Sequence, residues 1–120
     1  MKQIRYLLDE NVPHAIRYGL LRRRPEVEIH AVGHEIVPPL STPDPDILNW
    51  IEQEGYLLIT ENRSTMPPHL HEHLEAGRHI PGILILPRKY TIGGVIEDLL
   101  LIWEAAYPDE YQDKITYLPL

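Results

Sequence analysis

The chain has 120 residues, of which 43% are hydrophobic and 24% charged, with a formal net charge of −7 and no cysteine. This length and composition indicate one globular domain with a single core. The lack of cysteine excludes disulfides and thiolate zinc sites, and no stretch approaches the roughly 20 apolar residues of a membrane span. We therefore expect a cytoplasmic protein that makes no use of a membrane. The negative charge also disfavours charge-driven nucleic-acid binding over a broad surface.

The first element is a short strand over residues 4–8, whose largely apolar run is typical of a strand buried on both faces of a parallel sheet. It ends in Asp9, Glu10 and Asn11, and Pro13 then opens a helix that closes before Pro25. Three arginines over residues 22–24 suit the negative end of this helix, an interpretation that we prefer to a substrate-binding patch. Residues 27–32 predict a second strand, and a proline-bearing loop follows over 33–40.

The next helix starts at a clear signal, Ser41-Thr42-Pro43-Asp44, with a hydroxyl cap followed by a proline and an acid in the first turn. Gly55 ends this helix, and residues 56–60 form the clearest strand of the chain. A third helix starts with residues 66–68 and runs over 69–76.

The rest of the chain repeats the alternation of strands and helices. A fourth strand over residues 81–87 is bounded by prolines, and Thr91 caps a long apolar helix that contains Trp103. Residues 114–118 add a last strand. This order predicts one α/β domain over residues 1–120, with three layers and a central, mainly parallel sheet of four or five strands flanked by helices.

Acidic side chains occur at three places that such a sheet brings to one edge. Asp9 and Glu10 end the first strand, Asp44 starts the second helix together with Asp46, and Glu61 follows a later strand. Ligands of open α/β sheets bind beyond the carboxyl ends of the strands. Converging carboxylates need a cation, and Mg²⁺ or Mn²⁺ is the ion that prefers oxygen ligands and activates water for attack on phosphate. Each acid also has a plainer explanation as a helix-start residue.

The segments LLDEN-P, D-x-x-IL and GYLLIT-x-N-R together resemble small PIN-like proteins related to the toxin ribonucleases of toxin–antitoxin pairs. The resemblance runs from Ile4 to about Leu86. It implies a parallel sheet flanked by helices and acids that bind Mg²⁺ or Mn²⁺ to cut RNA. Asp9 matches the first acid of the family and Asp44 the second.

The third motif departs from the family, which usually has Thr-x-Asp-x-Asp after this strand. Here Asn62 and Ser64 replace both aspartates, as in a distinct subgroup with Thr-x-Asn-Arg. Asn62 offers only a neutral oxygen, so a metal held there binds more weakly. Glu61 is the neighbour of Asn62 in the sequence, so its side chain points to the opposite face of the strand from Asn62. Asn62 and Arg63 alternatively serve another ligand, such as a phosphate bound by the guanidinium.

Histidines gather on the third helix. His69 and His73 are four residues apart and share a face, the spacing of a zinc or nickel pair, and His71 lies between them. No HExxH motif accompanies them, so we favour partly exposed helix residues. His14, soon after Asp9, is a candidate to meet a phosphate.

We therefore interpret the chain first as a PIN-type, metal-dependent ribonuclease. The toxin half of a toxin–antitoxin pair is one role that such an enzyme could have. Its predicted catalytic residues are Asp9, Asp44, Glu61 and Asn62, its metal ligands Asp9, Glu10 and Asp44, and its substrate-binding residues Asn11, His14 and Arg63. A basic rim would come from Arg17, Arg22, Arg23, Arg24, Arg63, Arg78, Arg88 and Lys89.

The alternative is a catalytically inactive PIN-like module that binds RNA or a protein partner. An antitoxin protein is the expected partner if the chain is a toxin. The long apolar final helix offers a homodimer interface, and the same pattern also fits a helix packed on the sheet.

Overall fold

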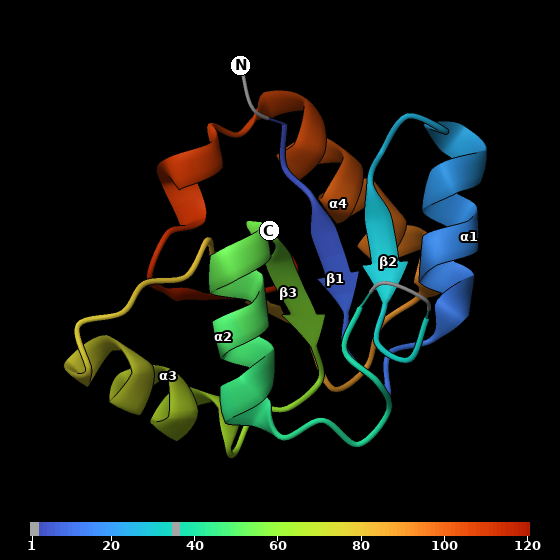
Figure 1. Cartoon of the computed structure of the whole chain (residues 1–120). Coiled ribbons are helices and arrows are strands. Elements are labelled where there is room, and N and C mark those ends of the chain that lie inside the picture. The colour runs from blue at the N-terminus through green and yellow to red at the C-terminus, as the bar shows by residue number, and fades with distance from the viewer. Residues whose placement is uncertain (1–2, 35–36) are drawn as a thin grey trace.

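A computed structural model of the chain describes residues 3–34 and 37–120, so part of the predicted loop over 33–40 lies outside the described residues. Strands and helices alternate along the chain (Figure 1). In order, the elements are β1 (Tyr6–Leu8), α1 (His14–Arg23), β2 (Ile29–Ala31), α2 (Asp44–Glu54), β3 (Leu57–Thr60), α3 (Met66–Glu75), β4 (Ile83–Ile85), α4 (Ile92–Ala105), the 3₁₀ helix Pro108–Tyr111 and β5 (Ile115–Tyr117).

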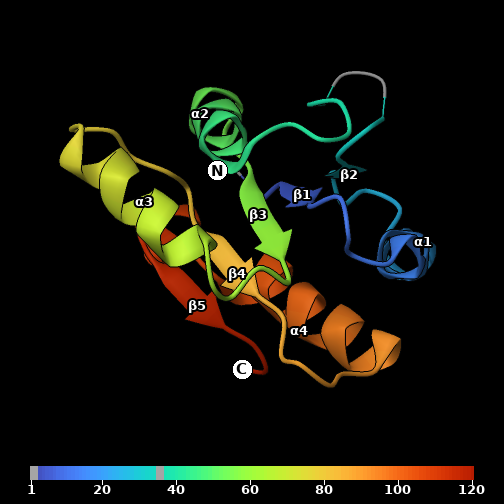
Figure 2. The same ribbon diagram turned by 90° about the horizontal axis from the view of Figure 1, so that it is seen from below.

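The strands form one sheet in the order β2-β1-β3-β4-β5, and every neighbouring pair is parallel. Helices α1 and α4 cover one face of the sheet, and α2 and α3 cover the other (Figure 2). The predicted three-layer α/β arrangement with a parallel sheet is therefore confirmed, at the upper of the two predicted strand numbers. The order is one of the common doubly wound orders, in which β1 and β3 lie at the topological switch point.

Successive side chains of each strand point to opposite faces of the sheet, and this divides the core into two parts. Leu8 and Ile59 face the side of α1 and α4, whereas Leu7 and Leu58 face the side of α2 and α3. These side chains are at most 2% exposed. Strands buried on both faces explain why their sequences read as continuous apolar runs.

Helix α4 is packed on the sheet, as one of the two sequence interpretations predicted. Ile96 and Leu99 lie in the core together with residues of α1. Gly19 of α1 permits this approach, because a Cβ there would overlap Cδ1 of Ile96. Among the described residues no helix is long and apolar enough to cross a membrane. The longest, α4, has 14 residues, against the roughly 20 that a span needs.

The predicted caps have mixed outcomes. Thr91 caps α4 by accepting a hydrogen bond from the Gly94 amide at 3.0 Å, and Gly55 ends α2 in the left-handed conformation with φ of 80°. The predicted hydroxyl cap from Ser41 or Thr42 is wrong, because α2 begins at Asp44 with Pro43 in the cap position and no side-chain cap. Ser41 instead has φ of 67°, and its amide donates a hydrogen bond to the side chain of Glu10, 31 residues earlier in the sequence.

Candidate functional site

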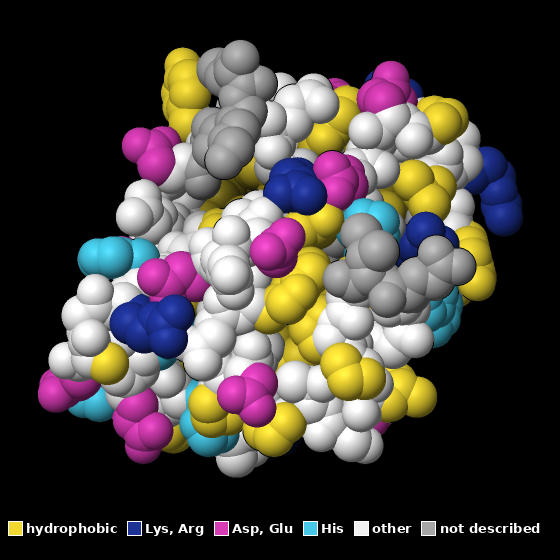
Figure 3. Space-filling view, in the orientation of Figure 1, with side chains coloured by type: hydrophobic (Ala, Val, Ile, Leu, Met, Phe, Trp, Pro, Cys, Tyr) yellow, Lys and Arg dark blue, Asp and Glu magenta, His cyan; other side chains and the backbone are white. Residues whose placement is uncertain are grey.

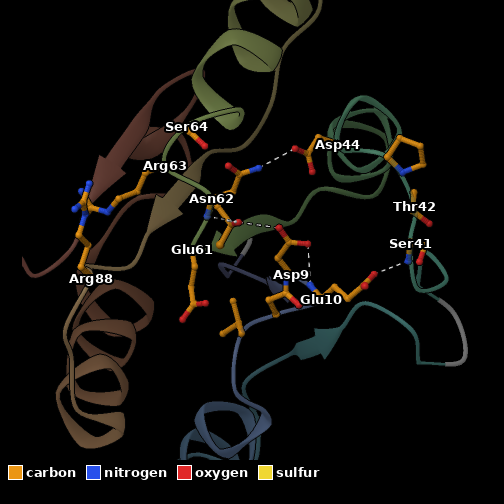
Figure 4. Close-up of a pocket in the computed structure, with 14 residues that line it drawn as sticks. Asp9, Glu10, Ser41, Thr42, Asp44, Glu61, Asn62, Arg63, Ser64 and Arg88 are labelled. Atoms are coloured by element: carbon orange, nitrogen blue, oxygen red, sulfur yellow. Dashed lines mark hydrogen bonds between the residues drawn. The ribbon is translucent and has the colours of Figure 1, made fainter.

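A pocket of about 790 Å³ lies at the carboxyl ends of β1 and β3 (Figure 4). This is the switch point at which open α/β sheets bind ligands. The walls come from three segments that are distant in the sequence and from Arg88, which follows β4. The lining residues are Asp9, Glu10, Asn11, Val12, Ser41, Thr42, Pro43, Asp44, Thr60, Glu61, Asn62, Arg63, Ser64 and Arg88. The predicted convergence of the three acidic places on one edge of the sheet is thus observed.

Asp9 occupies the centre of this pocket and is firmly oriented. Its amide donates to the Ile59 carbonyl at 2.9 Å, which extends the pairing of β1 with β3 by one residue. Its Oδ1 accepts the Glu10 amide at 2.8 Å, and its Oδ2 accepts the Thr60 hydroxyl at 2.7 Å. All of these donors are neutral, so they fix the carboxylate without cancelling its charge.

Thr60 is a site residue to which the sequence interpretation gave no role. It ends β3, is 1% exposed, and its hydroxyl oxygen also accepts the Asn62 amide at 3.1 Å. A buried hydroxyl must find partners, and here they are a carboxylate and the turn that follows the strand. The available signal was a polar residue that closes an otherwise apolar strand.

Asp44 stands at the first position of α2, where the helix dipole favours a negative charge. Its Oδ2 accepts the Asn62 side-chain amide at 2.9 Å and the Thr65 hydroxyl at 3.3 Å. His69 Nε2 lies 3.8 Å from the same oxygen. Within the part of the chain that the structure describes, no hydrogen bond involves the other oxygen, Oδ1. Asp44 therefore keeps a carboxylate oxygen available in the pocket.

Asn62 presents its amide nitrogen to Asp44, whereas the sequence interpretation assigned it a neutral oxygen ligand. Its Oδ1 accepts the Thr65 amide at 3.0 Å, and Nδ2 also donates to the Thr65 hydroxyl at 2.5 Å. This closed set of bonds makes Asn62 a residue that orients Asp44.

Glu10 and Glu61 line the pocket but are bonded away from its centre. Glu10 accepts the Ser41 amide, and Glu61 Oε2 accepts the Tyr90 hydroxyl at 2.6 Å. Tyr90 packs against the core on the side of α1 and α4, so Glu61 is directed to the opposite face from Asp44, as predicted. Burial, together with the smaller effect of the hydrogen bond to Glu61, raises the pKa of Tyr90 to about 12.

Two of the three predicted substrate-binding residues line the pocket, and the third does not. Asn11 and Arg63 line the pocket, and Arg88 joins them from the segment after β4. In Figure 4 the two arginine side chains lie on the side of the pocket opposite Glu10 and Ser41. His14 is not a lining residue, because its ring packs edge-on against His34 with centroids 5.2 Å apart.

The three histidines of α3 have different partners in the structure. His73 is 7% exposed, and its Nε2 lies 2.8 Å from Glu52 Oε1 and 3.1 Å from the His79 carbonyl oxygen. His69 instead faces Asp44, and His71 lies 3.2 Å from Glu75 on the exposed side of the helix. Their shared sequence spacing therefore conceals three different environments.

Two carboxylates, from Asp9 and Asp44, remain as ligand candidates in the pocket. Across residues 3–34 and 37–120, no group of three His, Asp or Glu side chains is arranged to hold a metal ion. Mg²⁺ commonly binds through one or two carboxylates and keeps several of its waters. The donor set therefore fits a hydrated Mg²⁺ or Mn²⁺, but not a tightly enclosed metal.

We compared the chain with protein-family models, with curated proteins and with solved structures, and none of the three comparisons gives a match.

Proposed function

We propose that the protein is a PIN-like, metal-dependent ribonuclease that hydrolyses phosphodiester bonds of RNA. The observation that carries this proposal is the meeting of Asp9 and Asp44 in one pocket that also contains Arg63 and Arg88. The acids suit a divalent cation, and the arginines suit the phosphate that the cation would polarise. The three sequence motifs that resemble PIN-like proteins support the same function.

In this proposal Asp9 and Asp44 hold Mg²⁺ or Mn²⁺, which supplies an activated water and stabilises charge on the phosphate. Thr60 and the Glu10 amide keep Asp9 in place. Asn62 does the same for Asp44. Such supporting bonds orient carboxylate ligands and raise their affinity for a metal.

The arginines bind the substrate. A guanidinium group donates two parallel hydrogen bonds to phosphate oxygens and keeps its charge at any physiological pH. On the face shown in Figure 3, Lys and Arg side chains are few and lie apart from one another. With a net charge of −7, this proposal places the attraction for RNA at the arginines of the pocket.

A second candidate function is an inactive PIN-like module that binds RNA or a protein. Asn62 favours it, because its amide satisfies Asp44 where the family usually has a third acid. This candidate predicts a folded protein that is indifferent to Mn²⁺. A toxin that forms a homodimer and is neutralised by an antitoxin fits either candidate, and a neighbouring gene for a small DNA-binding protein would support that role.

The test is cleavage of a labelled single-stranded RNA in the presence of Mn²⁺. We expect cleavage by the wild type that EDTA abolishes and that Asp9→Asn and Asp44→Asn reduce to background. Asp46→Asn is the matched control, since Asp46 is exposed two residues further along α2 and does not line the pocket. Cleavage that persists in Asp9→Asn or in EDTA would contradict the proposal. Absence of cleavage by the folded wild type in excess Mn²⁺ would favour the inactive module.

A further inference from the structure

The loop of residues 87–90, between β4 and α4, carries Arg88 into the wall of the pocket. These residues have neither helical nor strand structure, and Thr91 then caps α4. In the described part of the chain, no backbone hydrogen bond involves residues 87–90. A loop without backbone hydrogen bonds depends on its side chains to keep its position.

Tyr90 makes the side-chain contact that holds this loop. Its hydroxyl donates to Glu61 Oε2 at 2.6 Å, and its ring packs against the core on the side of α1 and α4. Because the pKa of Tyr90 is raised to about 12, mainly by burial, the hydroxyl keeps its proton at physiological pH and remains a donor. The bond joins the loop, two residues after Arg88, to the end of β3.

Glu61 is available for this contact because it is turned away from the other acids. In Figure 4 its side chain points away from Asn62 and Asp44. Its neighbour in the sequence, Asn62, is the residue that bonds to Asp44. Glu61 and Asn62 therefore have separate partners on the two sides of the pocket.

The two arginines of the pocket are held in different ways. Arg63 has contacts of its own, since its Nη2 donates to the Leu86 carbonyl at 3.3 Å and its guanidinium carbon lies 5.6 Å from the centroid of the Tyr117 ring. Arg88 has no contact of this kind among residues 3–34 and 37–120. Its place in the pocket therefore depends on the backbone of the loop.

We propose that Glu61 is a positioning residue, which together with Tyr90 holds the loop of residues 87–90 so that Arg88 stays in the wall of the pocket. This inference rests on the proposed function, in which Arg88 binds phosphate, and it gives Glu61 a role different from the catalytic one predicted from the sequence. The role requires only an acceptor oxygen at residue 61, so a carboxamide should serve as well as a carboxylate. A metal ligand or a general base requires the charge.

Four variants separate these roles. Glu61→Gln loses the charge and keeps an acceptor oxygen for Tyr90, whereas Glu61→Ala loses both. Tyr90→Phe removes only the hydroxyl. Tyr18→Phe is the matched control, because Tyr18 is 53% exposed on α1 and does not line the pocket.

The first measurement is fluorescence anisotropy of fluorescein-labelled octa-uridylate, with Asp9→Asn as the parent so that the probe is not cleaved. We expect Tyr90→Phe to weaken binding about fivefold, the effect of one hydrogen bond, and Tyr18→Phe to preserve it. Glu61→Ala should bind about fivefold more weakly than Glu61→Gln, which has lost the same charge. In the Glu61→Ala background Tyr90→Phe should have no further effect, since both changes remove the same bond.

The second measurement needs no RNA. Backbone order parameters of Arg88 and Lys89 from NMR relaxation should be about 0.85 in the wild type and below about 0.6 in Tyr90→Phe and Glu61→Ala. Glu61→Gln should keep the wild-type values. In a calorimetric titration, Glu61→Gln should also bind Mn²⁺ as the wild type does, because the charge of Glu61 is not used for the metal.

Four results would overturn the inference: unchanged RNA binding by Tyr90→Phe, equal RNA binding by Glu61→Ala and Glu61→Gln, unchanged order parameters in Tyr90→Phe, or loss of the wild-type Mn²⁺ binding in Glu61→Gln. The two variants of Glu61 provide the test even if Tyr90→Phe fails to fold.

Failure of this inference is distinguishable from failure of the proposed function. Mn²⁺-dependent cleavage of RNA that Tyr90→Phe leaves unchanged would refute only the positioning role. Lower order parameters in Tyr90→Phe, in a protein that neither binds nor cleaves RNA, would refute the proposed function and confirm that the bond holds the loop.

Discussion

The two ends of the sheet carry charged residues that behave in opposite ways. Arg5, Glu28 and Tyr56 immediately precede β1, β2 and β3 and bind one another at the amino end. Arg5 Nη2 lies 2.8 Å from Glu28 Oε2, the Tyr56 hydroxyl donates to the same oxygen at 2.6 Å, and the Arg5 guanidinium stacks 4.1 Å from the Tyr56 ring centroid. The charges at this end are matched by partners within the chain.

At the carboxyl end, the hydrogen bonds that Asp9 and Asp44 accept from the described residues come from neutral donors. Among the described residues, the one cationic candidate within 4 Å of either is His69, 3.8 Å from Asp44. Donors that orient a carboxylate but leave its charge uncompensated prepare it for an external cation. The comparison therefore separates a set of charges that serves stability from a set that is available for binding.

At the amino end, the pKa values of Glu28 and Tyr56 reflect the contacts that these side chains make with each other and with Arg5. The hydrogen bond from Arg5, assisted by that from Tyr56, lowers the pKa of Glu28 to about 2. Burial and the bond to Glu28 raise the pKa of Tyr56 to about 12.

The largest change in this comparison should come from Asn62→Asp, which places another carboxylate beside Asp44. The variant replaces an amide donor 2.9 Å from Asp44 by a like charge, so we expect its melting temperature in EDTA to fall by roughly 5 °C, for a cost of about 1–2 kcal/mol. Mn²⁺ should restore more stability to the variant than it adds to the wild type. Thermal melts with EDTA and with Mn²⁺ measure both effects.

Asn49→Asp is the control for this variant, because it adds the same charge to α2 at a residue that does not line the pocket. A melting temperature of Asn62→Asp that Mn²⁺ does not raise above the response of the wild type would argue against a metal at this end of the sheet.

A smaller effect is expected at the amino end from Glu28→Gln. Because the Glu28 side chain is 42% exposed, its ion pair is screened, and we expect a loss of about 1 kcal/mol in the free energy of unfolding near pH 7. A carboxyl whose pKa is lowered by folding contributes stability above its unfolded pKa, roughly 4.3, and this contribution disappears as pH falls toward about 2.

Urea unfolding of the wild type and Glu28→Gln from pH 7 to pH 2 measures this dependence. The difference between the two should be constant above about pH 5 and shrink below it. Glu26→Gln, at an exposed position two residues earlier, should show no such difference, and a pH-independent gap for Glu28→Gln would show that its ion pair is not the cause.

The sequence allowed prediction of the features that depend on local pattern. The positions of β1 and β3 were predicted from apolar runs that end in acids. The rule that ligands bind at the carboxyl ends of parallel strands was sufficient to predict that Asp9 and Asp44 lie at one edge of the sheet, where they line one pocket. Gly55 and Thr91 marked helix ends correctly, since their roles depend only on neighbouring residues.

Features that depend on long-range pairing were not predictable in the same way. The direction of the Asn62 amide follows from Thr65 and from Asp44, 18 residues away. The segment before α2 is likewise held from a distance, since the Ser41 amide donates to Glu10 and the helix begins only at Asp44. Tyr117 comes close to Arg63 only through the register of β5 on β4. His14 is close to Asp9 in sequence, but the turn into α1 carries it to His34.

The most direct test of the central claim, that the unmatched acids form a divalent-cation site, is a calorimetric titration of the wild type, Asp9→Asn and Asp46→Asn with Mn²⁺. We predict weak binding by the wild type and by Asp46→Asn, and none by Asp9→Asn, since Asp9 and Asp44 are the two candidate ligands in the pocket. No binding by the folded wild type, or equal binding by Asp9→Asn, would contradict the claim.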